Sequence, residues 1–202
     1  MNKDVAAILV SMAKYSICAA VCGKKDELEL FEKMYAHEMM NYAQLSEMGA
    51  TFVTLAKNKQ LRACIGTLRA HRPLWQDISK NAVAAALHDP RFSPVGEDEL
   101  SSLTVEVSVL SEPQELEYSG ADDLLEKLQP GIDGLILEYL GKRATFLPQV
   151  WEQLSEKEVF LDALCRKAGL EEGLWKTNAP MIWRYSVEKY GPEKIDVATN
   201  CA

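Results

Sequence analysis

The chain has 202 residues, of which 48% are apolar, and its formal net charge is −8. This length and composition provide for one buried core and favour a single domain over residues 1–202 rather than two independent domains. The negative net charge disfavours nucleic acid as a partner, because phosphate binding requires a basic surface. No apolar run approaches the roughly 20 residues of a membrane-spanning helix.

The cysteine pattern and the N-terminal residues predict a reducing, cytoplasmic environment. The cysteines are an odd number at scattered spacings: Cys18, Cys22, Cys64, Cys165 and Cys201. Such a set argues against the disulfide framework of a secreted protein. The apolar residues 5–10 are followed by Lys14 and by no small-residue cleavage site, so they are expected to form a helix rather than a signal peptide.

In chain order, the first half is predicted to contain three helices and three strands. Apolar residues recur at helical spacing in residues 2–22 and again from about residue 28 to residue 48. The period then changes to two in residues 51–56 and 61–68, which predicts a hairpin. A helix from Pro73 to His88 and a strand over residues 103–110 follow, so we expect a strand–helix–strand unit with a right-handed crossover.

The second half is predicted to contain a hairpin, a helix and a last strand. The turn residues Gly141 and Lys142 separate two β-rich runs, residues 135–140 and 143–147. Helical spacing returns between residues 150 and 168. Residues 181–190 alternate well enough to form one continuous strand.

The most unusual local sequence is Leu-Arg-Ala-Cys-Ile-Gly-Thr at residues 61–67. In a strand, Arg62 and Cys64 would point to one face about 6–7 Å apart, and the guanidinium would stabilise the nucleophilic thiolate. Gly66 would leave room for a ligand beside the sulfur. The alternative is that Cys64 is a small buried apolar residue and that Arg62 forms a structural ion pair with Glu106.

Further candidates lie after this segment. Of the three histidines, His71 is best placed to approach Cys64. Residues 89–92, Asp-Pro-Arg-Phe, are a stiff segment that would hold Arg91 either in a binding clamp or in a rigid return from helix to strand. Cys18 and Cys22 are four residues apart, but no second ligand pair accompanies them, so packing is favoured over a metal site. No metal and no cofactor is expected.

The charge is unevenly distributed. Residues 57–91 contain seven basic residues against two acidic ones, which leaves an acidic remainder. Two interpretations are open, namely ordinary solvated surface or an anion-binding face on an acidic body.

Seven short motifs follow one another between residues 52 and 190. They are Phe52-Val53-Thr54-Leu55, Leu61-Arg62-Ala63-Cys64-Ile65-Gly66-Thr67, Asn81-Ala82, Asp89-Pro90-Arg91-Phe92, Val107-Ser108-Val109-Leu110, Phe146-Leu147-Pro148-Gln149-Val150 and Tyr185-Ser186-Val187-Glu188-Lys189-Tyr190. In identity and order they resemble the AMMECR-domain family. One departure is plain, since the family's signature has glycine where this chain has Ala63.

The resemblance implies a two-lobed α+β fold, a mainly antiparallel sheet flanked by helices, with a smaller second lobe. N-terminal helices would occupy about residues 1–50 and the signature-bearing core residues 51–190. Microbial members look like protein A of the AmmeMemoRadiSam system, which implies a radical SAM protein and a Memo-like protein as partners. The resemblance does not supply a reaction.

Three functions therefore remain open. The leading hypothesis is an enzyme or enzyme subunit that binds an anionic ligand in a cleft, with Cys64 as nucleophile or covalent carrier and Arg62 as the charge beside it. The expected ligand-binding residues are Gly66, Thr67, His71, Asn81 and Arg91. The alternatives are a non-catalytic adaptor with an inert Cys64 and an RNA-contacting module. The last is least favoured because the basic segment lacks clustered aromatic residues.

Overall fold

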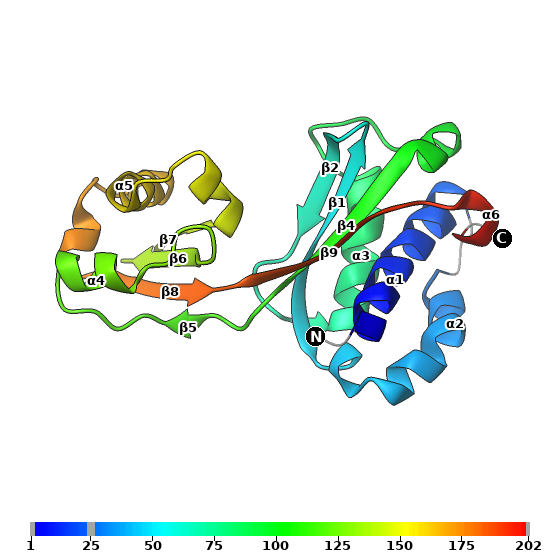
Figure 1. The fold of residues 1–202 in the computed structure, drawn as a ribbon, viewed down its shortest axis with the longest axis horizontal. Helices are drawn as coiled ribbons and strands as arrows, with labels where there is room; N and C mark the ends of the chain where they lie inside the picture. The colour runs from blue at the N-terminus through cyan, green and yellow to red at the C-terminus, as the bar shows by residue number, and fades with distance from the viewer. Residues whose placement is uncertain (1–2, 24–26, 201–202) are drawn as a thin grey trace. The chain divides into compact units, whose positions relative to one another are not determined.

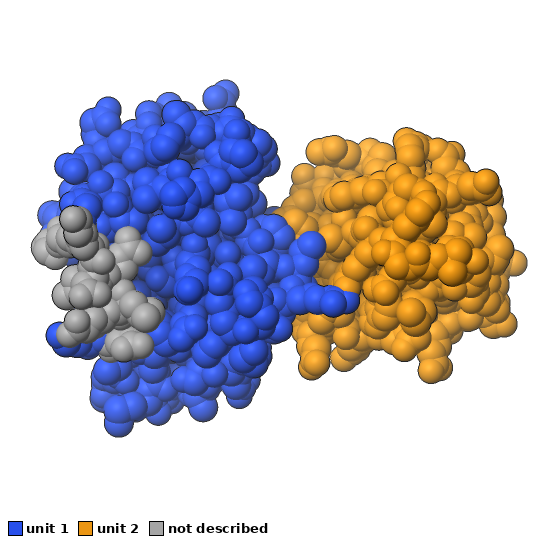
Figure 2. All heavy atoms as spheres, turned by 180° about the vertical axis from the view of Figure 1, so that it is seen from behind, with its two compact units in different colours: residues 1–110, 188–202 blue, residues 111–187 orange. Residues whose placement is uncertain are grey.

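The computed structural model of the chain describes residues 3–23 and 27–200 (Figure 1). They divide into two compact units (Figure 2). Unit 1 comprises Met1–Leu110 and Glu188–Ala202, and unit 2 comprises Ser111–Val187. Unit 2 is therefore an insertion between two strands of unit 1.

Unit 1 is built on one sheet with the strand order β2-β1-β4-β9, and a short β3 pairs with the start of β1. β1 is antiparallel to both β2 and β4, so the last two run parallel to each other on either side of it. The elements of this unit are α1 (Lys3–Val21), α2 (Glu27–Asn41), η1 (Ala43–Leu45), β1 (Met48–Lys57), β2 (Gln60–Gly66), β3 (Arg72–Pro73), α3 (Leu74–Leu87), η2 (Glu97–Ser102), β4 (Leu103–Leu110), β9 (Val187–Lys194) and α6 (Val197–Asn200).

The period-two pattern of these strands decides which face of the sheet is buried. Val53, Leu55 and Ala63 are fully buried and join one apolar cluster with side chains of α1 and α3, which pack on that face (Figure 1). Thr54, between Val53 and Leu55, and Cys64, which follows Ala63, are only half-buried. Because successive side chains of a strand alternate between faces, Thr54 and Cys64 belong to the opposite face.

Unit 2 has its own antiparallel sheet, with the order β5-β8-β6-β7, and its own core. At the centre of that core, Trp151 stacks on the fully buried Phe160 with 3.7 Å between ring centroids. The elements are β5 (Gln114–Glu115), α4 (Ala121–Lys127), β6 (Gly134–Tyr139), β7 (Lys142–Phe146), η3 (Pro148–Glu152), α5 (Lys157–Lys167), η4 (Leu174–Lys176) and β8 (Met181–Tyr185).

The predicted fold class is confirmed: helices flank antiparallel sheets in an α+β arrangement. Both hairpins, the helix after Pro73 and the strand over residues 103–110 are present. Within the described residues, no helix combines the length and the apolarity needed to cross a bilayer.

The second predicted helix is wrong at its end. It stops at Asn41 rather than at residue 48, because Tyr42 leaves the helical backbone (φ −123°, ψ 83°) and β1 already begins at Met48. Met48 and Gly49 pair with β3, and the next residue pairs with Leu110 of β4. Tertiary strand pairing thus overrides the helical spacing of residues 42–48.

Two other predicted elements are each divided in the structure. The helix expected over residues 150–168 is a 3-10 turn, η3, followed by α5, because Glu156 between them is extended (φ −81°, ψ 125°). The strand expected over residues 181–190 is interrupted at Ser186, so β8 belongs to the sheet of unit 2 and β9 to that of unit 1. The alternation of side chains along an extended segment does not show where the chain passes from one sheet to another.

Candidate functional site

Cys64 is a half-buried free thiol in the middle of β2. The neighbouring Ala63 is fully buried against the helices, so its side chain and the thiol lie on opposite faces. The methyl group of Ala63, at the position where the resemblance led us to expect glycine, therefore lies in the core and not on the face that carries Cys64.

Thr54 of β1 lies directly opposite Cys64. Its hydroxyl donates a hydrogen bond to the Cys64 sulfur over 3.3 Å. On its other side, Thr54 is opposite Glu106 of β4. Cys64, Thr54 and Glu106 thus form one transverse row on three adjacent strands.

The main chain of Cys64 is fixed by the segment after α3. The Cys64 N–H donates to Asp89 Oδ2 over 2.9 Å, and Arg91 Nη2 donates to the Cys64 carbonyl over 2.9 Å. Asp89 and Arg91 are also joined by hydrogen bonds of 2.7 and 2.9 Å. These bonds from Arg91, together with the Cys64 N–H, hold the pKa of the buried Asp89 well below its usual value. The motif of residues 89–92 therefore completes the outer edge of β2.

Arg62 is bound by a different partner from the one predicted. Its Nε donates to Glu99 over 2.7 Å and its Nη2 donates to the carbonyl of Ser93 over 2.9 Å. The predicted ion pair with Glu106 is wrong, because β1 separates β2 from β4 while η2 brings Glu99 to Arg62. Since Glu99 offsets its charge, Arg62 is a weak source of positive potential for the thiol.

Arg91 is the more accessible of the two arginines. Its side chain is 53% exposed, whereas that of Arg62 is 13% exposed. The Phe92 ring lies within 5.9 Å of the Arg62 guanidinium and within 5.5 Å of the Arg91 guanidinium. The hydrogen bonds to Asp89 raise the pKa of Arg91, and the Cys64 sulfur adds a smaller electrostatic contribution.

Gly66 does not leave an empty space. A Cβ atom at this position would lie 2.3–2.4 Å from the Phe52 ring and from the Thr51 carbonyl oxygen. The ring of Phe52, which is opposite Gly66 in the register, covers it. The expected room for a ligand at Gly66 is thus occupied by an aromatic side chain.

Thr67 and Asn81 belong to a buried network around Asp77. The Thr67 hydroxyl and the Asn81 amide donate to Asp77 Oδ2 over 2.6 and 2.9 Å, and Arg72 Nε donates to Oδ1 over 2.7 Å. Asp77 is fully buried and also accepts both donors of Thr51. This network ties β1 and the end of β2 to α3. Sequence reasoning missed Asp77 and Arg72, although an acid on the apolar side of a predicted helix was a usable signal.

His71 is exposed in the connection after β2, where its Nδ1 contacts the carbonyl oxygen of Arg69 over 3.0 Å. The arginines of residues 57–91 that form described ion pairs are each bound by a different acid: Arg62 by Glu99, Arg72 by Asp77 and Arg91 by Asp89. Much of the local positive charge is therefore compensated.

A family model described as AMMECR1 matches residues 10–190 of the chain. The chain belongs to the AMMECR1 family. Within this family it is 36% identical over 193 residues to protein LS215_2104 of Saccharolobus islandicus, which covers 92% of this chain and 80% of that protein. It is 34% identical over 171 residues to protein MJ0810 of Methanocaldococcus jannaschii, with coverage of 83% and 80%.

A solved structure extends the comparison to the fold. The crystal structure of uncharacterized protein PH0010 from Pyrococcus horikoshii matches with a TM-score of 0.71 at 30% identity, over 90% of this chain and 88% of that one. The predicted AMMECR-family membership is therefore confirmed.

The cysteines of this AMMECR1-family chain differ in state. Cys22, Cys64 and Cys165 are free, whereas Cys18 is disulfide-bonded. The disulfide at Cys18 is not typical of the predicted reducing environment, and it makes this sulfur unavailable to a metal shared with Cys22. Within residues 3–23 and 27–200, no three His, Cys, Asp or Glu side chains are grouped as metal ligands.

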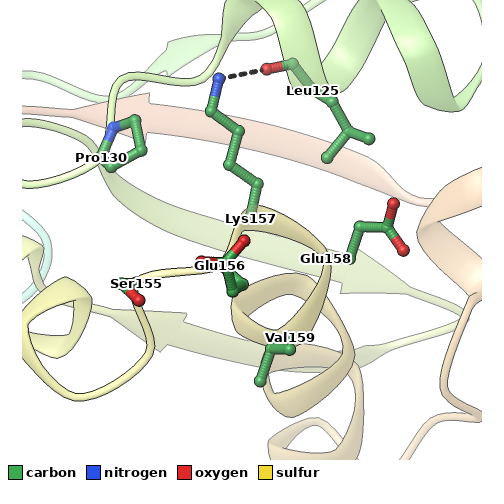
Figure 3. A pocket seen from close by; sticks show the side chains of 7 residues that line it. All are labelled: Leu125, Pro130, Ser155, Glu156, Lys157, Glu158 and Val159. Carbon is green, nitrogen blue, oxygen red and sulfur yellow. Dashed lines mark hydrogen bonds between the residues drawn. The ribbon is translucent and has the colours of Figure 1, made fainter.

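Two surface pockets are lined by residues outside the Cys64 row. The pocket in Figure 3, of about 480 Å³, is in unit 2 and is lined by Leu125, Pro130, Ser155, Glu156, Lys157, Glu158 and Val159. Its one cation, Lys157, donates to the Leu125 carbonyl over 2.6 Å. A pocket of about 300 Å³ in unit 1 is lined by Gln44, Glu47, Met48, Gly49, Leu74, Val109, Leu110 and Glu188. No residue predicted for the site lines either pocket.

Proposed function

We propose that this AMMECR1-family protein is an enzyme or an enzyme subunit in which Cys64 is the nucleophile or covalent carrier for an anionic ligand. The observation that supports this proposal is the environment of the thiol. It is free and half-buried, it accepts a hydrogen bond from Thr54 over 3.3 Å, and Arg91 is hydrogen-bonded to the carbonyl of the same residue. A donor and a cation beside a thiol both favour the reactive thiolate.

The proposal keeps Arg91 as the expected ligand-binding residue and transfers to it the role of the charge beside the thiol, which was expected of Arg62. Arg91 uses Nε and Nη2 in its described hydrogen bonds, which leaves the donors of Nη1 for a carboxylate or phosphate group. Arg62 is a positioning residue that links β2 to η2 through Glu99.

The proposal also includes the setting of the protein. We place it in the cytoplasm, with a radical SAM protein and a Memo-like protein as partners. The support for these partners is the resemblance to the AmmeMemoRadiSam system. The support for the location is that Cys22, Cys64 and Cys165 are free thiols, whereas the disulfide at Cys18 counts against it.

The test is the rate at which iodoacetamide alkylates each cysteine of the intact protein, read by peptide mass spectrometry at pH 7.5. We expect Cys64 to react faster than Cys22, and the buried Cys165 to react slowest. Arg91→Met should slow Cys64 roughly threefold to tenfold, because an exposed guanidinium acts through a screened field. Arg62→Met is the matched control and should change the rate less than about twofold, since Glu99 already offsets its charge.

The adaptor is the second candidate, and exposed methionines favour it. Met34, Met40 and Met48 are 50%, 84% and 60% exposed, and Met48 lines the pocket of unit 1. Flexible thioether side chains suit a surface that binds partner proteins. This candidate predicts that Cys64 reacts no faster than Cys22 and that Arg91→Met has no effect. The RNA-contacting module gains no support, because Arg62, Arg72 and Arg91 are ion-paired.

A further inference from the structure

Arg91 presents a positive group on one side of Cys64. In its ion pair with Asp89, the carboxylate side chain is 2% exposed and the guanidinium side chain is 53% exposed. The pair is therefore oriented with its cation toward solvent and its anion toward the protein. An anionic ligand would meet the guanidinium without meeting the compensating carboxylate.

Glu106 presents a negative group on the other side. The register places Thr54 opposite both Cys64 and Glu106, so the carboxylate belongs to the same face two strands away from the thiol. Glu106 is half-buried, and among the described residues it takes part in no side-chain hydrogen bond and no ion pair. The other acids near the site differ, because Asp89 and Glu99 are each bound by an arginine.

β9, the strand next to β4, has a glycine where it comes close to the backbone of Glu106. Gly191 of β9 is so close that a Cβ atom there would lie 2.6 Å from the Val105 carbonyl oxygen and 3.4 Å from the Glu106 Cα atom. A bulkier residue at this position would press on the backbone that carries Glu106. Gly191 therefore contributes no side chain that could cover the Glu106 carboxylate.

We propose that this site takes a zwitterionic ligand the size of a short peptide, with its carboxylate or phosphate at Arg91, its protonated amine at Glu106 and its middle over Cys64 and Thr54. The inference rests on the proposed function of Cys64 and names the substrate class of that site. Two inter-strand spacings, on the order of 10 Å, separate Cys64 from Glu106. Arg91 lies beyond the outer edge of β2, where it binds the Cys64 carbonyl, so the two charged groups are roughly 15 Å apart. An extended chain of three residues spans about 10 Å, and a hydrogen bond of about 3 Å at each end covers the remaining distance.

Thr54 is the positioning residue of the row. Its hydroxyl can donate one hydrogen bond and accept two, and it donates to the Cys64 sulfur. A ligand amine that engages the Glu106 carboxylate removes the competing acceptor on the other side of Thr54. The Thr54 hydroxyl then remains directed at the sulfur, so ligand binding and thiol orientation are coupled.

The experiment measures protection of Cys64 in the full chain against iodoacetamide at pH 7.5, with peptide mass spectrometry as the readout. Three probes are compared: triglycine, N-acetyl-triglycine, which lacks the cationic amine, and triglycine amide, which lacks the carboxylate. We expect triglycine to protect at a concentration about fivefold lower than either capped form, because each half-exposed ion pair is worth up to about that factor.

Glu106→Gln is the decisive variant, since it keeps the size of the side chain and removes its charge. It should raise the half-protecting concentration of triglycine to that of N-acetyl-triglycine and leave the value for N-acetyl-triglycine unchanged. Glu126→Gln, at an exposed glutamate of unit 2, is the matched control and should change none of the three values.

Equal protection by all three probes, protection by none, or an equal effect of Glu106→Gln on every probe would each overturn the inference. The rates without a probe separate this failure from that of the proposed function. If Cys64 is no more reactive than Cys22, the nucleophile itself is wrong. A reactive Cys64 that does not discriminate among the probes removes only the zwitterionic ligand.

Discussion

At the scale of single residues, the segment of residues 61–67 contains one candidate for chemistry and two residues with structural roles. Cys64 lies on the half-buried face of the sheet, whereas Gly66 and Thr67 serve the fold. Gly66 admits the Phe52 ring, and Thr67 donates to the buried Asp77. An aromatic ring placed over a glycine on the neighbouring strand is a recognised way to fill the gap that the glycine leaves.

Gly66→Ala should destabilise the protein by about 2–3 kcal/mol, because the new methyl group meets the Phe52 ring and a backbone oxygen that has little freedom to move. The measurement is urea unfolding followed by circular dichroism. Gly96→Ala is the control, since the atom nearest to its new Cβ is the carboxylate of the flexible Asp98. Its effect should stay below about 1 kcal/mol. Equal effects of the two substitutions would show that the fit of Phe52 on Gly66 is not tight.

At the scale of elements, the segment after α3 protects the edge of β2. An edge strand exposes unpaired backbone groups, and Asp89 and Arg91 pair with both backbone groups of Cys64. Arg62 reaches across to the same segment through the carbonyl of Ser93. Asp89 and Arg91 thereby hold the backbone of Cys64 in place, and the bond between Arg62 and Ser93 ties the same segment to β2.

Asp89→Asn should lower the free energy of unfolding by about 1.5–3 kcal/mol at neutral pH, the usual contribution of hydrogen bonds to a charged group. The folded-state pKa of Asp89 lies below its unfolded value of about 3.9. Its contribution is therefore fully present above that value and is lost as the pH falls through the folded-state pKa. The difference between wild type and variant should be constant from pH 7 to about pH 5 and shrink below about pH 4.

The measurement for Asp89→Asn is urea unfolding at several pH values between 3 and 7. The exposed Asp122 gives the control, and Asp122→Asn should change stability by less than about 0.5 kcal/mol throughout. A difference at Asp89 that grows toward low pH would contradict the assigned direction of its pKa shift.

At the scale of the whole molecule, two cores share one chain. The cluster of unit 1 contains Ile78, and that of unit 2 contains Phe160. The chain leaves unit 1 after β4 and returns at β9, so unit 2 is complete between these two strands. Separate apolar cores permit separate unfolding transitions.

Phe160→Ala should destabilise unit 2 by about 3–5 kcal/mol, because it leaves a cavity beside the Trp151 ring. Of the four tryptophans, Trp75 lies in unit 1 and the other three in unit 2. Tryptophan fluorescence in a Trp75→Phe background therefore reports on unit 2. Ile78→Ala in unit 1 is the matched substitution and should leave the midpoint of this signal unchanged. If both substitutions shift it equally, the two units unfold as one.

The sequence by itself determined the features that depend on local periodicity and on motif identity. Alternation over residues 103–110 predicted β4 at its observed bounds. The turn residues Gly141 and Lys142 predicted the hairpin of β6 and β7, although Lys142 is already the first residue of β7. The ordered motifs predicted the family, and alternation in residues 61–67 separated Cys64 from Ala63. These inferences succeeded because they require only the geometry of one strand or one turn.

Only the tertiary structure decided which segments meet. The partner of Arg62 is Glu99 and not Glu106, because the place of β1 between β2 and β4 depends on the order of strands in the sheet. The division of residues 181–190 between two sheets, and the burial of Asp77 beneath Thr51, Thr67 and Asn81, are likewise long-range. The period of a strand fixes the face on which a side chain lies, whereas its partners are fixed by strand order, which local periodicity does not encode.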